Sequence, residues 1–204
     1  MRPSIYLASQ SPRRRELLRQ IDVHFELLLF RGAGRADPEL DEAPYPDESP
    51  EHYVERLALM KAEGGVRRVQ MRRLVRHPVL GADTALDLDG TIIGKPTSRQ
   101  DAFEILNKLS GRTHRVLTAV SLADEQRTES LLSVSEVSFR KLSDLEIRRY
   151  VETGESIDKA GAYGIQGRAA AFVSEIRGSY SGIMGLPLYE TANLLDRFGM
   201  PLFR

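Results

Sequence analysis

The chain has 204 residues, in which 29 lysines and arginines balance 29 aspartates and glutamates, so that it carries no net charge at neutral pH. This balance argues against the overall basic field of a nucleic-acid-binding protein, and the absence of cysteine excludes disulfides, thiolate metal sites and a cysteine nucleophile. No signal peptide or membrane-spanning apolar run is recognisable, so we expect a cytoplasmic protein with neither a membrane nor a nucleic-acid partner.

Strand-like and helix-like segments alternate along the chain, which predicts an α/β fold. In chain order, the pattern predicts a strand at 4–8, a helix at 12–20, a strand at 23–30, a helix from 50 to about 63, strands at 78–88 and 91–94, a helix from 98 to 111, strands at 114–123 and 129–140, a helix from 143 to 154, a strand at 171–176 and a helix at 188–198. Residues 31–48 are predicted to form a loop, and the basic stretch 67–77 fits a helix end followed by a solvated turn. We expect one domain over residues 1–204, with a boundary between two lobes near Arg140.

The helix predicted at 12–20 begins with a concentration of positive charge. Ser11 and Pro12 suit its N-cap and first helical position, and three consecutive arginines follow at 13–15. A helix N-terminus already carries partial positive charge and unpaired N–H groups, so these arginines indicate an anion bound opposite them. Ser9 and Ser11 can donate their hydroxyl groups to the same anion. The alternative is an ordinary solvated helix start.

Two lysines and one aspartate favour the same anion site. Lys61 falls on the apolar stripe of the helix that begins at residue 50, where a charge is unfavourable unless it reaches solvent or meets an anion. Asp83 lies at the end of an apolar run, where it can hold a divalent metal, act as a general base, or be an ordinary turn residue. Lys95 is not part of a P-loop, because proline follows it where Ser or Thr would bind Mg²⁺, but it can still contact phosphate.

Residues 158–167 contain three glycines, paired charges and one tyrosine, a composition that lets the backbone approach a ligand closely. The Gln166 amide both donates and accepts hydrogen bonds, so it can recognise the edge of a nucleotide base. The alternative is a tight structural turn. His114 has no metal-ligating partner at a recognisable spacing, and we interpret it as a strand residue.

Taken together, these blocks resemble the Maf family of nucleoside triphosphate pyrophosphatases over nearly the whole chain. The resemblance rests on SxSPRR at 9–14, YxxRLAxxKA at 53–62, GADT at 81–84, GKP at 94–96, LSGxxHxVxT at 109–118, DKAGAYGIQG at 158–167 and GLPL at 185–188. It implies a central mixed, twisted sheet flanked by helices, in an elongated two-lobed domain with a cleft between the lobes. It also implies house-cleaning hydrolysis of dTTP or UTP between the α and β phosphates, which gives a nucleoside monophosphate and pyrophosphate.

The resemblance assigns expected roles to single residues. Asp83 matches the family's proton acceptor, and three residues match positions associated with base selection: Arg13, Thr84 and Gln166. Five more match other active-site positions: Ser9, Arg14, Glu42, Lys61 and Lys95. The expected cofactor is a divalent metal cation, Mg²⁺ or Mn²⁺, held by phosphate oxygens, Asp83 and Glu42. A homodimer is expected as well.

A second function stays open at this point, namely a nucleotide-binding regulator of cell division or septum formation with little turnover. The presence of Asp83, Lys61 and Lys95 argues against an inactive enzyme. Release of pyrophosphate from dTTP, measured with and without Mg²⁺, separates the two functions.

Overall fold

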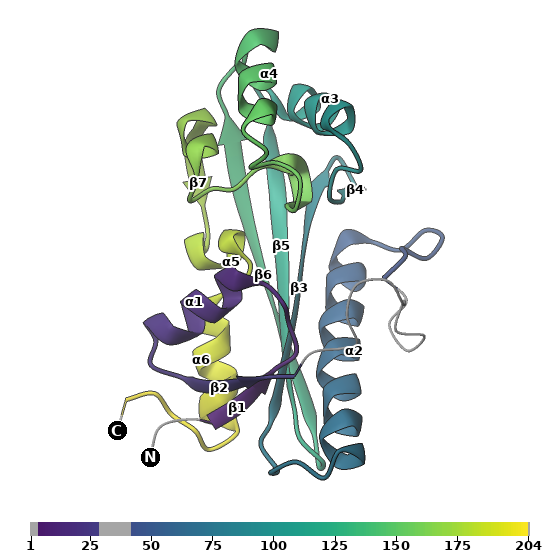
Figure 1. The fold of residues 1–204 in the computed structure, drawn as a ribbon, viewed down its shortest axis with the longest axis vertical. Helices are drawn as coiled ribbons and strands as arrows, with labels where there is room; N and C mark the ends of the chain where they lie inside the picture. Colours follow the sequence, from purple (N-terminus) through teal and green to yellow (C-terminus); the bar gives the residue numbers. More distant parts are fainter. Residues whose placement is uncertain (1–3, 29–41, 204) are drawn as a thin grey trace.

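Three long antiparallel strands form the spine of the molecule in a computed structural model that describes residues 4–28 and 42–203 (Figure 1). They are β3 (Val79–Leu88), β5 (Thr113–Ala123) and β6 (Thr128–Phe139). The shorter strands are β1 (Ser4–Leu7), β2 (His24–Leu27), β4 (Thr91–Ile93) and β7 (Val173–Arg177). The described strands form one mixed sheet in the order β2-β1-β3-β5-β6-β7, with β4 paired to β3. Strand β1 runs parallel to β2 and β3, and the other pairings are antiparallel.

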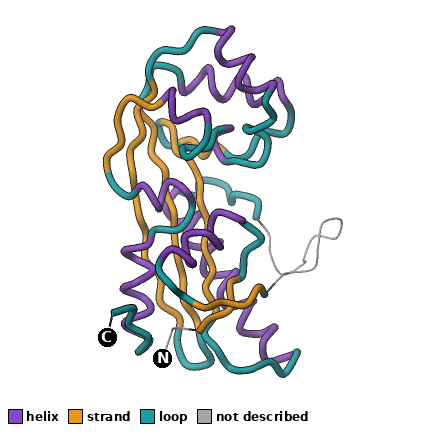
Figure 2. The backbone as a smooth tube through the Cα atoms, turned by 60° about the vertical axis from the view of Figure 1, so that its left-hand side comes forward, coloured by secondary structure: helices purple, strands orange, loops and turns teal. Residues whose placement is uncertain are grey.

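Helices surround the sheet at both ends of the molecule (Figures 1 and 2). The lower lobe contains α1 (Pro12–Gln20), α2 (Pro50–Met71) and α6 (Leu188–Arg197), and the upper lobe contains α3 (Arg99–Leu109) and α4 (Asp144–Glu152). The short helix α5 (Tyr180–Met184) lies between the lobes, and two 3₁₀ turns, η1 (Ala160–Ala162) and η2 (Arg168–Phe172), belong to the upper lobe. Within the described residues, no helix combines the length and apolarity needed to cross a membrane.

The spine strands contribute to the hydrophobic cores of both lobes. On β3, Leu80 is buried in the lower core with Leu18 and Leu195, whereas Leu86 is buried in the upper core with Val116. The same strands therefore hold both lobes in one structure, which confirms the predicted elongated, two-lobed α/β fold with a mixed central sheet. The position of a lobe boundary near Arg140 stays a prediction.

Most predicted elements are confirmed, and the differences have local causes. The helix at 12–20 has the predicted bounds, with Ser11 as N-cap and proline at the first position. Helix α2 continues to Met71, well beyond the predicted end near residue 63, because Gly64 and Gly65 are buried inside it rather than ending it. The strand predicted at 171–176 is wrong at its start, where residues 168–172 form η2. Helix α5 was not predicted. Of the loop predicted at 31–48, residues 31–41 lie outside the described part, as do residues 29–30 of the predicted strand.

Helix α2 packs against β3 closely enough to require a glycine. A Cβ atom added to Gly81 would lie 2.4 Å from the carbonyl oxygen of Ala58 and 2.6 Å from the backbone nitrogen of Ala62. Both atoms belong to the backbone of α2, so a side-chain rotation cannot relieve the overlap. The separation of α2 from β3 is therefore set at Gly81, two residues before Asp83.

We expect Gly81→Ala to lower the free energy of unfolding by about 1–3 kcal/mol, because α2 must move away from the sheet. Thermal or urea unfolding measures this loss. Gly94→Ala is the matched control, since a Cβ there would meet no atom of the described residues within 4 Å. Equal stability of the two variants would contradict the close approach.

An aromatic cluster in the upper core surrounds a buried histidine. The side chain of His114 is 2% exposed, its ring meets Phe139 and Tyr163 edge-on, and its Nε2 atom lies 2.8 Å from the hydroxyl of Tyr163. Its Nδ1 atom has no hydrogen-bond partner among the described residues. Burial lowers the pKa of His114 to about 4, so the ring is neutral in the folded protein at neutral pH.

The unfolded chain protonates His114 below about pH 6.5, whereas the folded protein does so only near pH 4. Stability from this residue is therefore complete above pH 6.5 and is lost as the pH falls towards 4, by at most about 1.4 kcal/mol per pH unit. We expect His114→Asn to be less stable at pH 7 but to lose less stability between pH 6.5 and 4.5. Urea unfolding across this range measures both slopes, and identical slopes would contradict the buried neutral state.

Candidate active site

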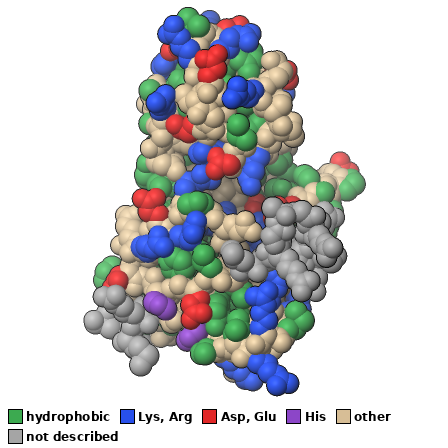
Figure 3. Space-filling view, in the orientation of Figure 1, with side chains coloured by type: hydrophobic (Ala, Val, Ile, Leu, Met, Phe, Trp, Pro, Cys, Tyr) green, Lys and Arg blue, Asp and Glu red, His purple; other side chains and the backbone are tan. Residues whose placement is uncertain are grey.

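A cleft of about 710 Å³ opens between the two lobes. Figure 3 shows basic and acidic side chains next to one another about midway along the long axis of the molecule, where the lobes meet. All ten residues assigned to a site from the sequence line the cleft: Ser9, Ser11, Arg13, Arg14, Glu42, Lys61, Asp83, Thr84, Lys95 and Gln166. They come from segments spread over most of the chain, and the structure brings them together. Their chemical roles remain predictions.

The ammonium group of Lys61 lies between two carboxylates at the centre of the cleft. Its Nζ atom is 2.6 Å from Oδ1 of Asp83 and 2.9 Å from Oε1 of Glu42. The side chains of Lys61 and Asp83 are only 13% and 14% exposed, so this pair is partly shielded from water. Burial raises the pKa of Glu42, but the charge and hydrogen bond of Lys61, followed by the charge of Lys95, lower it by more, and the net pKa is below its usual value.

A helix and a strand position the two members of this partly shielded pair. Lys61 is in the middle of α2, beyond the buried residues Leu57 and Ala58 of the same helix. Asp83 is in the middle of β3, directly after buried Ala82, so its predicted place at a strand end is wrong, as is the alternative of a turn residue: the strand continues to Leu88. Because Gly81 lets this helix and strand approach closely, the two side chains meet across the contact. The apolar stripe of Lys61 thus leads to an anion rather than to solvent.

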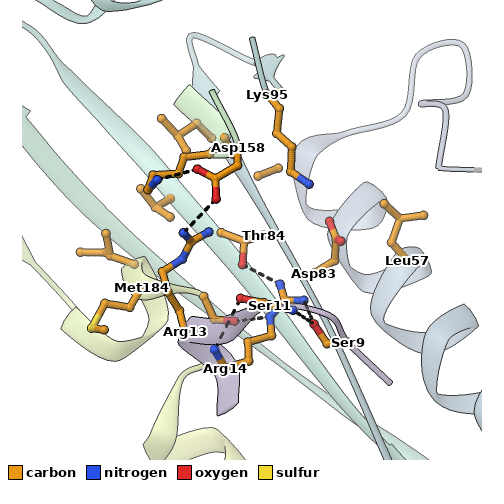
Figure 4. Close-up of a pocket in the computed structure, with 18 of the residues that line it drawn as sticks. Ser9, Ser11, Arg13, Arg14, Leu57, Asp83, Thr84, Lys95, Asp158 and Met184 are labelled. Atoms are coloured by element: carbon orange, nitrogen blue, oxygen red, sulfur yellow. Dashed lines mark hydrogen bonds and ion pairs between the residues drawn. The ribbon is translucent and has the colours of Figure 1, made fainter. Parts of the chain in front are cut away.

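Arg14 is held by the protein on several sides (Figure 4). Its Nε donates to the carbonyl oxygen of Gly185 at 2.7 Å, and its two terminal nitrogens donate to the hydroxyls of Ser9 at 3.2 Å and Thr84 at 3.3 Å. Burial lowers the pKa of Arg14, and the charge of Asp83 opposes this effect, but an arginine remains a cation in either case. Three of its five N–H groups therefore position α1, β3 and the end of α5 around the cleft.

The two serines at the start of α1 organise the backbone. The Ser11 hydroxyl accepts from the backbone N–H of Arg14 at 3.5 Å, as an N-cap does, and the Ser9 hydroxyl accepts from the backbone N–H of Ser11 at 3.2 Å. The predicted N-cap is confirmed. The start of α1 faces the cleft, so its N-terminal charge, Arg13 and Arg14 meet the space between the lobes, whereas Arg15 does not line it.

Arg13 reaches across the cleft to the upper lobe. Its guanidinium lies 3.8 Å from the carboxylate of Asp158, which also accepts from Lys159 at 2.5 Å (Figure 4). Burial raises the pKa of Asp158, but the hydrogen bond and charge of Lys159 and the charge of Arg13 lower it by more. Unlike Arg14, Arg13 has a single long ion pair among the described residues, with a carboxylate that is 68% exposed. Its guanidinium is therefore available for a ligand.

Apolar side chains gather in the upper part of the cleft, together with Lys95, Asp158 and Lys159. Lys95 points its ammonium group into the cleft from above (Figure 4). Gln166 comes from the loop after η1, beside a group of apolar lining residues: Leu86, Val116, Tyr163, Ile165, Ile183 and Met184. The cleft therefore has a charged half, suited to phosphates, and an apolar half with an amide, suited to a flat heterocycle.

The acidic side chains match a divalent cation that arrives with a ligand better than a permanent protein-bound metal. Among the described residues, no group of three or more potential ligands from His, Cys, Asp and Glu comes together. Asp83 and Glu42 each use one oxygen atom for Lys61, which leaves one oxygen on each. Two carboxylate oxygens beside a phosphate site match the way Mg²⁺ binds through one or two carboxylates, phosphate oxygens and water.

Two functional neighbours were missed from the sequence. The Gly185 carbonyl fixes Arg14 from 171 residues away, and a backbone oxygen carries no side-chain signature. The Thr118 hydroxyl lies 3.0 Å from that of Thr84 and donates to the carbonyl oxygen of Gly182 at 2.8 Å. Its membership of the LSGxxHxVxT block is the sequence signal that could have indicated Thr118, and the β3–β5 register pairs it with Thr84.

Comparison with known proteins identifies the family of the chain. Residues 4–198 match the family described as Maf-like protein. The chain is 68% identical to the dTTP/UTP pyrophosphatase of Aromatoleum aromaticum over 97% of both chains. It is 56% identical to the dTTP/UTP pyrophosphatase of Dechloromonas aromatica over 96% of this chain and 97% of that one. The solved Ham1 protein of Staphylococcus aureus is similar at 15% identity and a TM-score of 0.49, over 96% of this chain and 97% of that one. On its sequence match over nearly its whole length, this chain belongs to the Maf-like protein family.

Proposed function

We propose that this chain hydrolyses pyrimidine nucleoside triphosphates, dTTP and UTP, at the bond between the α and β phosphates, with release of a nucleoside monophosphate and pyrophosphate. The observation that carries the proposal is the convergence of Arg13, Lys61, Lys95 and Asp83 on one cleft. The names of the relatives from Aromatoleum and Dechloromonas support the substrate class.

The cations of the cleft suit a triphosphate. Arg13, Lys95 and the start of α1 border the same space, and a triphosphate would supply negative charge opposite all three. Phosphoryl transfer depends mainly on positioning and on electrostatic stabilisation of the transition state, so no covalent nucleophile is required. Arg14 acts by holding these groups in place as well as by its charge.

Asp83 is the group that accepts the proton of the attacking water. Lys61 binds Oδ1 of this carboxylate, which orients the side chain and leaves Oδ2 with one lone pair for the proton of the water and one for a cation. After the bond to the leaving pyrophosphate breaks, the proton on Asp83 can return to solvent through the open cleft. Lys61 also balances the negative charge of Asp83 beside an anionic substrate.

A divalent cation, Mg²⁺ or Mn²⁺, would be held by Asp83 and Glu42 together with the phosphates. When bound, it supplies positive charge that neutralises the phosphate oxygens. Lys61 lies between the same two carboxylates and keeps them close to each other before the nucleotide arrives.

Gln166 and the apolar half of the cleft are suited to the base. The Gln166 amide can donate to one edge atom of a pyrimidine and accept from another. Tyr163 and Ile165 would contact the pyrimidine ring. Arg13 and Thr84 complete the expected base-selecting set.

The alternative of a division regulator with little turnover is not favoured, because the relatives carry the names of enzymes. The homodimer, the cytoplasmic location and the lack of a nucleic-acid partner stay predictions. Size-exclusion chromatography with light scattering tests the first of them.

We expect Asp83→Asn to lower kcat for dTTP by about 10²–10⁴-fold, because the amide cannot accept the proton. Turnover is measured as pyrophosphate release, with chromatography to identify the monophosphate. Asp89→Asn is the matched control, since this exposed hairpin residue pairs with Arg112 outside the cleft, and it should keep normal turnover. Normal kcat in Asp83→Asn, or loss of a single phosphate instead of pyrophosphate, would contradict the proposal.

We expect Gln166→Ala to change the ranking of substrates more than the rate on the best one. Values of kcat/KM for dTTP, UTP, CTP and purine triphosphates give the ranking. Gln100→Ala removes the same side chain from the exposed surface of α3, where it bonds to Glu104, and should leave the ranking unchanged. If Gln166→Ala retains the wild-type ranking, this amide does not read the base.

A further inference from the structure

The segment at 42–48 brings Glu42 to Lys61 although it contains no helix or strand. Residues 42–47 are exposed, so burial in a core does not fix their conformation. An irregular exposed chain costs conformational entropy to order, and specific contacts must offset that cost. The question is which contacts keep Glu42 within reach of the ammonium group.

The guanidinium of Arg56, on α2, binds this segment through several contacts. Its Nε and one terminal nitrogen donate to the two carboxylate oxygens of Glu48 at 2.6 and 2.7 Å. The same terminal nitrogen donates to the carbonyl oxygen of Ala43 at 3.0 Å. The guanidinium also lies over the ring of Tyr45, 4.0 Å from its centre. The side chains of Arg56 and Glu48 are 17% and 7% exposed, so the pair is shielded from solvent more than an ordinary surface ion pair.

Tyr53, one helical turn before Arg56, secures Glu42 itself. The Tyr53 hydroxyl donates to the carbonyl oxygen of Glu42 at 3.1 Å. The carbonyl groups of Glu42 and Ala43 are thus held by neighbouring side chains of α2, the helix that also carries Lys61. Figure 1 shows the segment that precedes α2 folded back beside the upper end of this helix. Helix α2 therefore fixes the position of the Lys61 ammonium group and also that of the Glu42 backbone.

We propose that Arg56 is the positioning residue that fixes Glu42 against Lys61, through its forked bond to Glu48 and its contact with Ala43. The expected effect on kcat/KM rests on the proposed hydrolysis, whereas the expected effect on the conformation of residues 42–48 does not. A guanidinium is required, because its planar fork binds both oxygens of Glu48, a backbone carbonyl and an aromatic face at once. A lysine ammonium at the same position is a single point charge on a flexible stem.

A double-mutant cycle tests this role. Arg56→Lys keeps the charge but loses the fork, and we expect kcat/KM for dTTP to fall about 10- to 100-fold, the effect of displacing a catalytic group by about 1 Å. Glu42→Gln removes the group that Arg56 positions. In the Glu42→Gln background, Arg56→Lys should therefore cause less than about a twofold further loss, because coupled residues are not additive. An equal loss in both backgrounds overturns the proposal.

Amide hydrogen exchange gives a readout that needs no substrate. Peptides covering residues 42–48 should exchange at least about 10-fold faster in Arg56→Lys than in the wild type, while the body of α2 keeps its protection. Unchanged exchange in this segment overturns the proposal. If the wild type shows no nucleotide hydrolysis, the proposed function fails, and the exchange result still decides the structural claim.

Arg140 provides a matched control in the upper lobe. Its guanidinium donates to the carbonyl oxygens of Ala171 and Lys141 at 3.1 Å each and to Glu146 at 2.7 Å, outside the cleft. Arg140→Lys should leave kcat/KM and the exchange of residues 42–48 unchanged. If Arg56→Lys does not fold, Glu48→Gln replaces it in the cycle, because that change breaks the same fork and leaves Arg56 intact.

Discussion

The ammonium of Lys61 between Asp83 and Glu42 is the interaction on which the cleft depends. A partly buried lysine loses hydration, and the two carboxylates compensate for that loss with short charge-assisted bonds. The same arrangement keeps two acidic groups next to each other and next to an excess of cations. Without Lys61 the carboxylates would repel each other, and without them the lysine would be buried on an apolar helix face with no partner.

Packing of α2 against β3 makes that interaction possible. Gly81 removes the Cβ atom that would separate the helix from the strand, so the side chains of Lys61 and Asp83 meet directly. The spine strands continue from there into the upper lobe, where Leu86 belongs to a different core from Leu80. The two halves of the cleft are thus built on the same strands.

Two adjacent arginines at the start of α1 point in different directions and contact different partners. Arg14 turns inward and bonds to Ser9, Thr84 and Gly185, whereas Arg13 turns across the cleft towards Asp158. Consecutive helix residues point about 100° apart, so one can face the protein and the next can face the ligand. The helix N-terminus therefore tolerates adjacent positive charges, because Arg14 bonds to protein dipoles while Arg13 faces the cleft and Asp158.

The order of residues alone is enough to predict the helix starts and to name the charged and polar groups of the site. Ser11, Ser98 and Ser143 are N-caps at the predicted helix starts, because the capping side chain bonds to a backbone N–H only three residues further on. The family blocks contain nine of the ten predicted site residues that line the cleft, and Glu42 lies outside them. Only the tertiary structure decided which groups meet: Lys61 with Asp83, Arg14 with Gly185, and Arg56 with the segment that carries Glu42. These contacts join distant segments or backbone carbonyls, which have no periodicity or capping signature, so they follow from the packing of α2 and α5 on the sheet rather than from any local pattern.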